Sequence, residues 1–375
     1  MIPLCIPEIR GNEWKYIKEC LDTNWVSSAG KYVDLFEEKF KEYIGAEKAV
    51  VTMNGTAALH LALKILGIGD GDEVIVPSMT FIASVSPITY VGAKPVFADV
   101  RKDTFVMDVD KIEELITEKT KAILPVHIYG YMVDMEPLMK LAKKHNLYVI
   151  EDATESLGSE YKTSDGRWHK AGTLGDIGCF SFNGNKLITT GAGGMLVTNN
   201  NDMGDRGKFL STQAKIVEEN KSFFHPEVGY NFRMPNILAA MGVAQLENID
   251  EYIAIKRNNA KLYNEFLSEV KGIYLPAEKD YFKNCYWLYS MVIKDERGSV
   301  RDKLIWALKD KGIETRPFFS SLHNMKPFKE CRRGAMSITD DVVANGINLP
   351  SSVGLKKEDV VHICNIIKEQ LNGNM

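Results

Sequence analysis

The chain has 375 residues, of which 45% are hydrophobic and 26% are charged. This length predicts two or three domains, and the composition is that of a globular protein rather than a disordered one. The formal net charge at pH 7 is −4 and no basic block stands out, so we do not expect nucleic acid as a partner. No uninterrupted apolar stretch approaches the roughly 18 residues that a transmembrane helix needs, so we expect no membrane partner.

The N-terminal segment and the cysteines predict where the protein works. The segment MIPLCIPEIRGNEW lacks the basic stretch followed by an apolar stretch that marks a secretory signal. The six cysteines are dispersed and form no C-x-x-C pair, which is typical of reduced thiols rather than of disulfides or a zinc site. We therefore expect a cytoplasmic enzyme that binds no metal.

Short apolar runs alternate with longer amphipathic ones between about residues 45 and 200. The predicted strands are Ala49–Met53, Glu73–Pro77, Pro95–Ala98, Ala122–Val126, Leu147–Ile150, Ile177–Phe182 and Met195–Thr198. The predicted helices are Thr56–Leu66, Ala83–Val91, Val109–Thr117 and Met135–His145. This alternation predicts an α/β fold whose mixed, mostly parallel sheet is covered on both faces.

Beyond about residue 235 the pattern changes to long helices with few strands. The predicted elements there are a helix over Pro235–Leu267, a strand over residues 287–293, and helices over Val300–Lys311 and Lys357–Leu371. These elements predict a smaller α+β domain. We expect a large domain over residues 1–245, which includes the N-terminal segment, and a small domain over residues 246–375.

The first segment with chemical potential is Asn54-Gly55-Thr56, between a predicted strand and a predicted helix. A small-residue turn that opens a helix leaves backbone N–H groups free at the positive end of the helix dipole, which suits a phosphate. The alternative is a simple helix cap made by Asn54 or Thr56.

The second segment is Glu151-Asp152, directly after the apolar strand residues LYVI. Ligands of open α/β sheets bind outside the carboxyl ends of the strands, so these acids are placed where a ligand crevice is expected. The alternative is an acidic strand end that faces solvent or caps the next helix.

The third segment, residues 181–200, carries Lys186 in a polar loop followed by a glycine-rich turn. Glycines at this density indicate positive φ angles or a close approach of the backbone to another group. A single lysine on a loop is most often solvated, which is the alternative here.

In the fourth segment, Asn231 and Arg233 precede Pro235 and a long helical pattern. By itself this pattern is typical of a polar loop with proline at a helix start.

The segments become specific when they are considered together. A helix N-terminus for a phosphate, the Asp152 carboxylate for a pyridine nitrogen, and a lysine with the Ser181 hydroxyl nearby in sequence are the groups that a pyridoxal 5'-phosphate site requires. The lysine bonds the cofactor's aldehyde and moves a proton, and the carboxylate keeps the ring nitrogen protonated. We therefore predict pyridoxal phosphate as the cofactor.

Six stretches of the chain resemble one known family. They are NGTAALHLAL, EVIVPSMTFIAS, YVGAKPVFADV, EDATESLGS, SFNGNKLITTGAGGM and YNFRMPNILAAMGVAQLE. With them, the sequence resembles the DegT/DnrJ/EryC1/StrS family of nucleotide-sugar aminotransferases along its whole length, which implies the type I aminotransferase fold. The N-terminal stretch GNEWKYIKECLDTNWVSSAGKYVDLFEE and the loop SFNGNK are similar to members that aminate C4 of UDP-linked 4-keto-6-deoxy-N-acetylhexosamines in bacillosamine- and legionaminic-acid-type pathways.

The resemblance implies a role for each matching residue. Lys186 is the implied Schiff-base lysine, and Asp152 binds the pyridinium nitrogen. The implied phosphate ligands are Gly55, Thr56, Ser181 and, from the neighbouring subunit of a homodimer, Asn231. The remaining implied contacts are Phe81 stacked on the cofactor ring, Glu155 near the cofactor's 3'-hydroxyl and His323 near the sugar nucleotide. Without the surrounding motif, Phe81 is typical of a core aromatic and His323 of a structural histidine.

Three positions depart from the pattern common in the family. Glu155 stands where relatives commonly have Gln or His, the residues Asn183-Gly184-Asn185 precede the lysine where many members have Pro or Ala-Thr, and Ala192 replaces a frequent acid. None of these changes removes an essential group.

We expect a transamination in two half-reactions, in which L-glutamate donates the amino group and a 4-keto-6-deoxy sugar nucleotide accepts it at C4 for surface glycan synthesis. The resemblance implies that this sugar is UDP-linked. The alternatives are amination at C3, a dehydratase on the same scaffold, or a non-catalytic cofactor-binding sensor. Related dehydratases replace the lysine with histidine, whereas Lys186 is present here.

Overall fold

A seven-stranded sheet forms the centre of the protein in the computed structural model, which describes residues 1–218, 221–276, 278–295 and 299–372. The strand order is β1-β9-β8-β5-β4-β2-β3. These strands are β1 (Lys48–Thr52), β2 (Glu73–Pro77), β3 (Lys94–Ala98), β4 (Thr120–Ile123), β5 (Tyr148–Asp152), β8 (Ile177–Ser181) and β9 (Gly194–Thr198). All pairs from β8 to β3 are parallel, and only β9 runs antiparallel to both of its neighbours, which confirms the predicted mixed, mostly parallel sheet.

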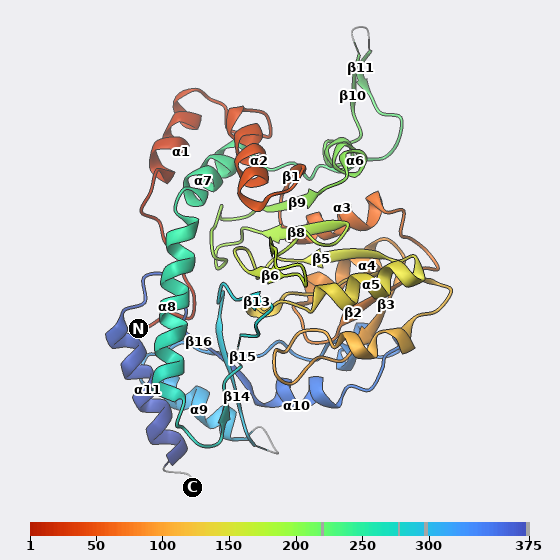
Figure 1. Cartoon of the computed structure of the whole chain (residues 1–375). Coiled ribbons are helices and arrows are strands. Elements are labelled where there is room, and N and C mark those ends of the chain that lie inside the picture. Colours follow the sequence, from red (N-terminus) through yellow and green to blue (C-terminus); the bar gives the residue numbers. More distant parts are fainter. Residues whose placement is uncertain (219–220, 277, 296–298, 373–375) are drawn as a thin grey trace.

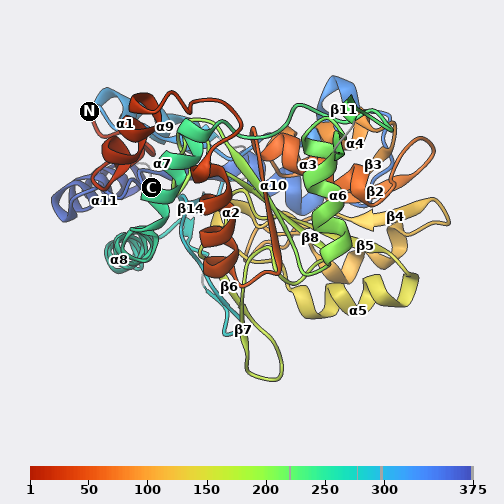
Figure 2. The same cartoon turned by 90° about the horizontal axis from the view of Figure 1, so that it is seen from above.

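Helices pack on this sheet because its strands are apolar on both faces, as in β9, where all five residues are buried. The helices of this part are α1 (Glu13–Asp22), α2 (Lys31–Ile44), α3 (Gly55–Ile65), α4 (Ser86–Tyr90), α5 (Met135–His145), α6 (Asn201–Ser211) and α7 (Asn236–Leu246). Helix α3 contacts β8 and β9, α5 contacts β5, and α1 and α2 both pack against α7 (Figures 1 and 2).

Three predicted helices are divided in the structure. Residues 83–91 form η1 (Ile82–Ser84) and the short α4, which begins where Pro87 fits a first helical turn. Residues 109–117 form only the 3₁₀ turns η2 (Val109–Lys111) and η3 (Glu113–Leu115).

The predicted helix over Pro235–Leu267 consists of two helices, α7 and α8 (Ile249–Leu267). Asn248 separates them with a non-helical ψ of 6°, and its side-chain amide donates to the carbonyl of Ala244 at 3.2 Å. The division follows from packing, because α7 lies against α1 and α2 whereas α8 lies against the C-terminal helix.

The C-terminal part is built on a second, antiparallel sheet with the order β12-β14-β16-β15. Its elements are β12 (Ile273–Tyr274), β14 (Tyr289–Ile293), β15 (Arg316–Pro317), β16 (Gly346–Leu349), α9 (Ser299–Asp310), η5 (Leu322–Asn324), η6 (Lys326–Phe328), α10 (Ser337–Asn345) and α11 (Lys357–Asn372). Helices α8, α9 and α11 cover this sheet around a separate hydrophobic core (Figure 1).

Two small sheets and one short turn complete the fold. They are the three-stranded sheet of β6 (Glu160–Lys162), β7 (Trp168–Lys170) and β13 (Phe282–Lys283), the hairpin of β10 (Ile216–Glu218) and β11 (Lys221–Phe224), and η4 (Ile128–Gly130). The hairpin projects from the body of the protein in Figure 1. Among the described residues, no helix is long and apolar enough to cross a membrane.

The two parts share elements, so the domain boundary between residues 245 and 246 stays a prediction. Tyr252 of α8 belongs to the core under the large sheet, whereas Tyr263 of the same helix belongs to the second core. At the N-terminus, the carbonyl of Leu4 accepts the N–H of Ser351 at 2.7 Å, which ties the first residues to the C-terminal part.

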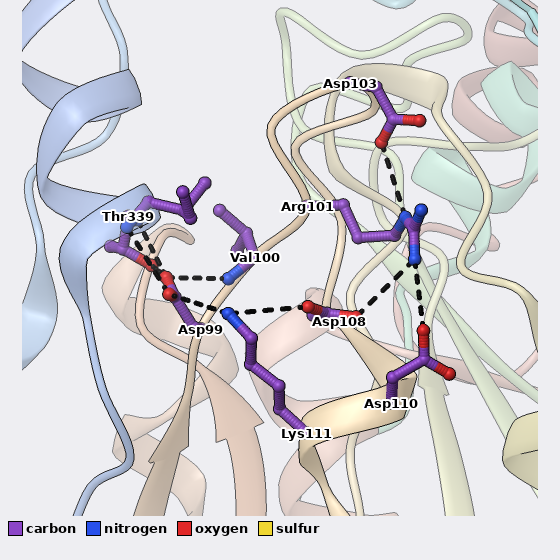
Figure 3. Close-up of polar contacts among 9 residues, drawn as sticks. Asp99, Val100, Arg101, Asp103, Asp108, Asp110, Lys111 and Thr339 are labelled. Carbon is purple, nitrogen blue, oxygen red and sulfur yellow. Dashed lines mark hydrogen bonds and ion pairs between the residues drawn. The ribbon is translucent and has the colours of Figure 1, made fainter.

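Asp99, directly after β3, joins the large sheet to α10 of the C-terminal part. One carboxylate oxygen of this buried side chain accepts the N–H of Thr339 at 2.8 Å and its hydroxyl at 2.7 Å, and the N–H of Val100 at 3.0 Å. Lys111 lies 3.6 Å from the other oxygen (Figure 3). Asp99 therefore acts as an N-cap from outside the helix, since the first turn of α10 has no acceptor of its own for these N–H groups.

Beside this cap, Arg101 lies among three further acids (Figure 3). Its guanidinium nitrogens are 3.4–3.6 Å from carboxylate oxygens of Asp103, Asp108 and Asp110. Asp103 is in turn 2.6 Å from Lys279 of the C-terminal part. The loop after β3 is thus bound to the C-terminal part at two places.

We predict that Asp99→Ala lowers the free energy of unfolding by about 2–4 kcal/mol, because it leaves buried donors of Thr339 without an acceptor. Asp99→Asn retains one oxygen acceptor, so it should lower the free energy of unfolding clearly less than Asp99→Ala does. Urea unfolding of both variants measures the difference. An unfolding free energy of Asp99→Ala equal to that of the wild type would contradict the capping role.

Candidate active site

A cavity of about 960 Å³ lies between the large sheet and the C-terminal part. The residues that follow β2, β5 and β8 line it, at the carboxyl ends of these parallel strands. This is the position at which open α/β sheets bind their ligands. The opposite wall comes from Trp287, Glu314, residues 316–320 and Asn348.

Most of the residues proposed from the sequence meet at this cavity. Those that line it are Gly55, Thr56, Phe81, Asp152, Glu155, Ser181 and Lys186. They come from four separate segments of the chain, so their convergence is a property of the tertiary structure. Phe81 is not a core aromatic, because 54% of it is exposed although it lines the cavity.

The turn before α3 combines a helix cap with backbone N–H groups at the cavity. The side chain of Asn54 caps the helix by accepting the N–H of Ala57 at 2.8 Å. The N–H groups of Gly55 and Thr56 belong to the same first turn, which has no intrahelical acceptor for them, and they lie at the cavity. A Cβ atom at position 55 would stand 3.0 Å from side-chain atoms of Ser181 and Thr154, so glycine lets these residues close around the helix N-terminus.

Glu151 and Asp152 have different roles because successive side chains of a strand point to opposite faces. Asp152 lines the cavity. Its carboxylate accepts the hydroxyl of Ser84 at 2.7 Å and the N–H of Thr154 at 3.1 Å. Since Ser84 donates to Asp152, the Thr80 hydroxyl, 2.7 Å away, donates to Ser84. A buried carboxylate needs such partners, and these hydroxyls fix its orientation.

Glu151 is structural and lies on the other face, fully buried. Its carboxylate accepts four donors, which are the N–H groups of Gly172, Leu174 and Gly175 at 2.6–2.9 Å and Nε2 of His127 at 2.8 Å. Nδ1 of His127 accepts the N–H of Val133, so the ring hydrogen lies on Nε2. Desolvation acts to raise the pKa of Glu151, but the hydrogen bonds outweigh it and the pKa is lowered from its ordinary value.

The amine of Lys186 lies between a carboxylate and an aromatic ring. Its Nζ atom is 3.4 Å from Oε1 of Glu155 and 3.9 Å from the ring centroid of Trp287. Burial raises the pKa of Glu155, although the charge of Lys186 and a hydrogen bond from the N–H of Tyr129 act in the opposite direction. The side chain of Lys186 is only 13% exposed, so this lysine is not a solvated loop residue.

Two predicted site residues do not reach the cavity of this chain. Asn231 is exposed near the base of the β10–β11 hairpin, where it forms a backbone bridge with Thr212. His323 is buried, with its Nδ1 2.7 Å from the hydroxyl of Ser78 and its Nε2 3.4 Å from Asp340. These contacts are those of a structural histidine, and a role at the sugar nucleotide stays a prediction.

Sequence reasoning missed Ser84, Thr80 and Trp287. The first two belong to the stretch PSMTFIAS, in which only Phe81 was singled out. Their hydroxyls near a predicted ligand site were a usable signal. Trp287 stands about 100 residues after the lysine loop, and nothing near it in the sequence indicates a site.

Comparisons with known proteins identify the family of this chain. The model described as the DegT/DnrJ/EryC1/StrS aminotransferase family matches residues 7–368. The chain belongs to this family.

Individual relatives agree with that assignment. The GDP-perosamine synthase of Escherichia coli O157:H7 is 45% identical over 370 residues, which cover 98% of each chain. The GDP-perosamine synthase of Caulobacter vibrioides is 42% identical over 96% of this chain and 95% of the relative. A Streptococcus pneumoniae protein described as a sugar aminotransferase, solved in PMP and PLP forms, superposes with a TM-score of 0.94 in the PMP form at 27% identity, with full coverage of both chains.

The DegT/DnrJ/EryC1/StrS aminotransferases depend on pyridoxal phosphate, so the predicted fold, enzyme class and cofactor are confirmed. The residues at the cavity fit this cofactor. The helix N-terminus beside Gly55 forms a cradle for an anion, the carboxylate of Asp152 suits a protonated ring nitrogen, and the exposed ring of Phe81 offers an apolar face.

We predict that Glu151→Gln lowers the free energy of unfolding by about 2–3 kcal/mol at pH 7, since an amide NH₂ then faces backbone N–H donors. The pKa of Glu151 is lower in the folded protein than its ordinary value of 4.5. The stabilisation of the folded state by ionised Glu151 is therefore complete above pH 4.5, and it is lost as the pH falls through the folded-state pKa. The difference between wild type and variant should therefore narrow below pH 4.5.

Urea unfolding across this pH range measures the effect. Glu113→Gln is the control, because Glu113 pairs with Lys144 and His145 at the exposed surface. A stability difference for Glu151→Gln that grows with acidification would contradict the assignment.

Proposed function

We propose that this aminotransferase transfers the amino group of L-glutamate to the C4 carbonyl of a GDP-linked 4-keto-6-deoxy sugar, giving a 4-amino sugar nucleotide for surface glycan synthesis. The observation that carries the proposal is the position of Lys186 at the cavity that also contains Asp152 and the N-terminus of α3. When bound, pyridoxal phosphate supplies an aldehyde and an electron-withdrawing ring.

Each residue at the cavity has a proposed task in this reaction. Lys186 would hold the cofactor through Nζ, and as a free amine it would remove and return a proton at the carbon that bears the substrate's amino group. Asp152 holds the proton on the ring nitrogen, and the hydroxyls of Ser84 and Thr80 orient its carboxylate. Gly55, Thr56 and Ser181 would hold the phosphate, and Phe81 would offer an apolar face to the ring. Glu155, whose Oε1 lies 3.4 Å from Nζ of Lys186, would lie near the cofactor's 3'-hydroxyl.

The nucleotide is the point at which we revise the sequence expectation. The resemblance pointed to UDP-linked sugars, whereas the two relatives at 42% and 45% identity are named for a GDP-linked sugar. Their similarity extends over 96% and 98% of this chain. We therefore propose GDP as the nucleotide, and the UDP-linked sugar is the alternative that the substrate test includes.

We further propose a cytoplasmic homodimer with shared active sites, in which Asn231 serves the partner's phosphate site. Asn231 forms a backbone bridge with Thr212, near the start of the β10–β11 hairpin. This hairpin projects from the body of the protein (Figure 1). Phe223 in this hairpin and Val228 after it are 76% and 89% exposed, and large apolar side chains in such positions are typical of interaction surfaces.

Lys186→Ala should abolish the visible absorbance shift of the bound cofactor and lower turnover by at least about 10²- to 10⁴-fold, because both the covalent bond and the proton transfer depend on this amine. Lys186→Arg is the matched control, since it keeps a positive charge beside Glu155 but cannot bond an aldehyde. It should be equally inactive. Turnover of Lys186→Ala at the wild-type rate would refute the assignment.

The substrate class is tested with glutamate and a panel of freshly prepared 4-keto and 3-keto sugars linked to GDP, UDP or dTDP. We expect the highest kcat/KM with the GDP-linked 4-keto-6-deoxy sugar and formation of 2-oxoglutarate in equal amount. A higher kcat/KM with the UDP-linked 4-keto sugar would overturn the proposal of GDP as the nucleotide. Amination of only 3-keto sugars would overturn the C4 proposal.

A further inference from the structure

Trp287 is the one aromatic residue of the C-terminal part whose ring lies directly over the amine of Lys186, within the part of the chain that the structure describes. It stands just before β14 and is 4% exposed, although it lines the cavity. The distance of 3.9 Å from Nζ of Lys186 to the ring centroid is well inside the range of a cation–π contact.

Trp287 is fixed from three sides. Its indole N–H donates to the carbonyl of Asn185 at 2.6 Å, so the ring is bound to the residue next to Lys186. Its own carbonyl accepts Nζ of the buried Lys256 at 3.1 Å. Its ring also packs nearly parallel to that of Tyr129, with 6.3 Å between centroids. A ring held in this way presents its face to Lys186 in one orientation.

Tyr129 connects Trp287 to the other partner of the amine. The backbone N–H of Tyr129 donates to Oε2 of Glu155 at 3.0 Å, and Oε1 of Glu155 is 3.4 Å from Nζ of Lys186. Tyr129 has a φ of +55°, an uncommon value for a bulky residue, which the contacts of its ring and N–H maintain. Lys186, Trp287, Tyr129 and Glu155 therefore form a closed circle of contacts, here called the lysine cage.

The lysine cage restricts the position of the Lys186 amine within the cavity. A lysine side chain has several rotatable bonds, so without partners it samples many positions. The proposed reaction requires this amine to leave the cofactor and to return to it in each turnover. The cage provides a defined position for the free amine, with a carboxylate on one side and an electron-rich ring face on the other.

We propose that Trp287 is a positioning residue that, together with Glu155, holds the free amine of Lys186 at the cavity whenever it is not bonded to the cofactor. This inference rests on the proposed role of Lys186. The positioning role requires the aromatic face of Trp287, whereas a purely structural role in the hydrophobic core would require only its volume.

The first test compares Trp287→Phe, which keeps a ring face, with Trp287→Met, which fills similar space without one. In the protein freed of cofactor, peptide mass spectrometry follows acetylation of Lys186 by acetic anhydride, which reacts more slowly with an amine that is held against the protein than with one that is free to move. We expect acetylation at least about fivefold faster in Trp287→Met, in keeping with the loss of a partly desolvated cation–π contact, and near the wild-type rate in Trp287→Phe.

Trp306→Met is the matched control. Trp306 is 60% exposed, and Nζ of Lys309 lies 4.6 Å from its ring centroid. This variant removes a second tryptophan–lysine contact without touching the cavity, so acetylation of Lys186 should not change. Equal acetylation of Lys186 in Trp287→Met and Trp287→Phe would overturn the proposal.

The second test keeps the shape of the ring and serves if Trp287→Met does not fold. Replacement of all tryptophan by tetrafluorotryptophan weakens the electron-rich face at nearly constant size, and it should speed acetylation of Lys186 in the wild type but not in Trp287→Phe. Acetylation that does not respond to fluorination would contradict a role of the ring face.

Kinetics of the complete enzyme provide the last readout. In Trp287→Met, kcat should fall at least about tenfold while the KM values for glutamate and the sugar nucleotide change less than about threefold, and Trp287→Phe should recover most of kcat. A parallel loss in both variants, together with a lower melting temperature, indicates a structural role and would overturn the inference. If the wild type transaminates no sugar, the proposed function fails, whereas the acetylation result still decides whether the cage exists.

Discussion

The alternation of side chains at the end of β5 is the constraint on which the site depends. Because consecutive strand residues face opposite ways, Glu151 and Asp152 act on opposite sides of the same sheet. Glu151 gathers the N–H groups of residues 172–175, which precede β8, and β8 leads to the loop of Lys186. Asp152 lines the cavity, as do residues of the Lys186 loop. Of these two neighbouring residues, Glu151 thus holds the segment before β8 in place, and Asp152 supplies the carboxylate of the site.

The cavity combines charged groups that are costly to bury with partners that offset this cost. Asp152 has the hydroxyl of Ser84 and a backbone N–H, and Lys186 has Glu155 and the face of Trp287. Low exposure strengthens each of these interactions because little water competes with them. Contacts within the protein therefore hold both Asp152 and Lys186 in place.

Much of the fold could be predicted from periodicity, since strands buried on both faces leave nearly continuous apolar runs such as VIVP. The errors occur where a local pattern competes with tertiary packing. The helical pattern over Pro235–Leu267 continues through Asn248, yet the chain breaks there because α7 and α8 pack in different surroundings. Residues 109–117 carry helical periodicity but form only 3₁₀ turns.

The sequence by itself determined the α/β class, the family, the cofactor and the loops that hold Lys186 and Asp152, because these properties reside in contiguous motifs whose spacing is local. Only the tertiary structure decided which acid of the Glu151-Asp152 pair enters the cavity, that His323 pairs with Ser78 instead of lining it, and that Trp287 covers the lysine. These outcomes depend on side-chain direction and on contacts between residues distant in the chain. A linear pattern does not carry that information, since it is fixed only when the two parts of the protein pack together.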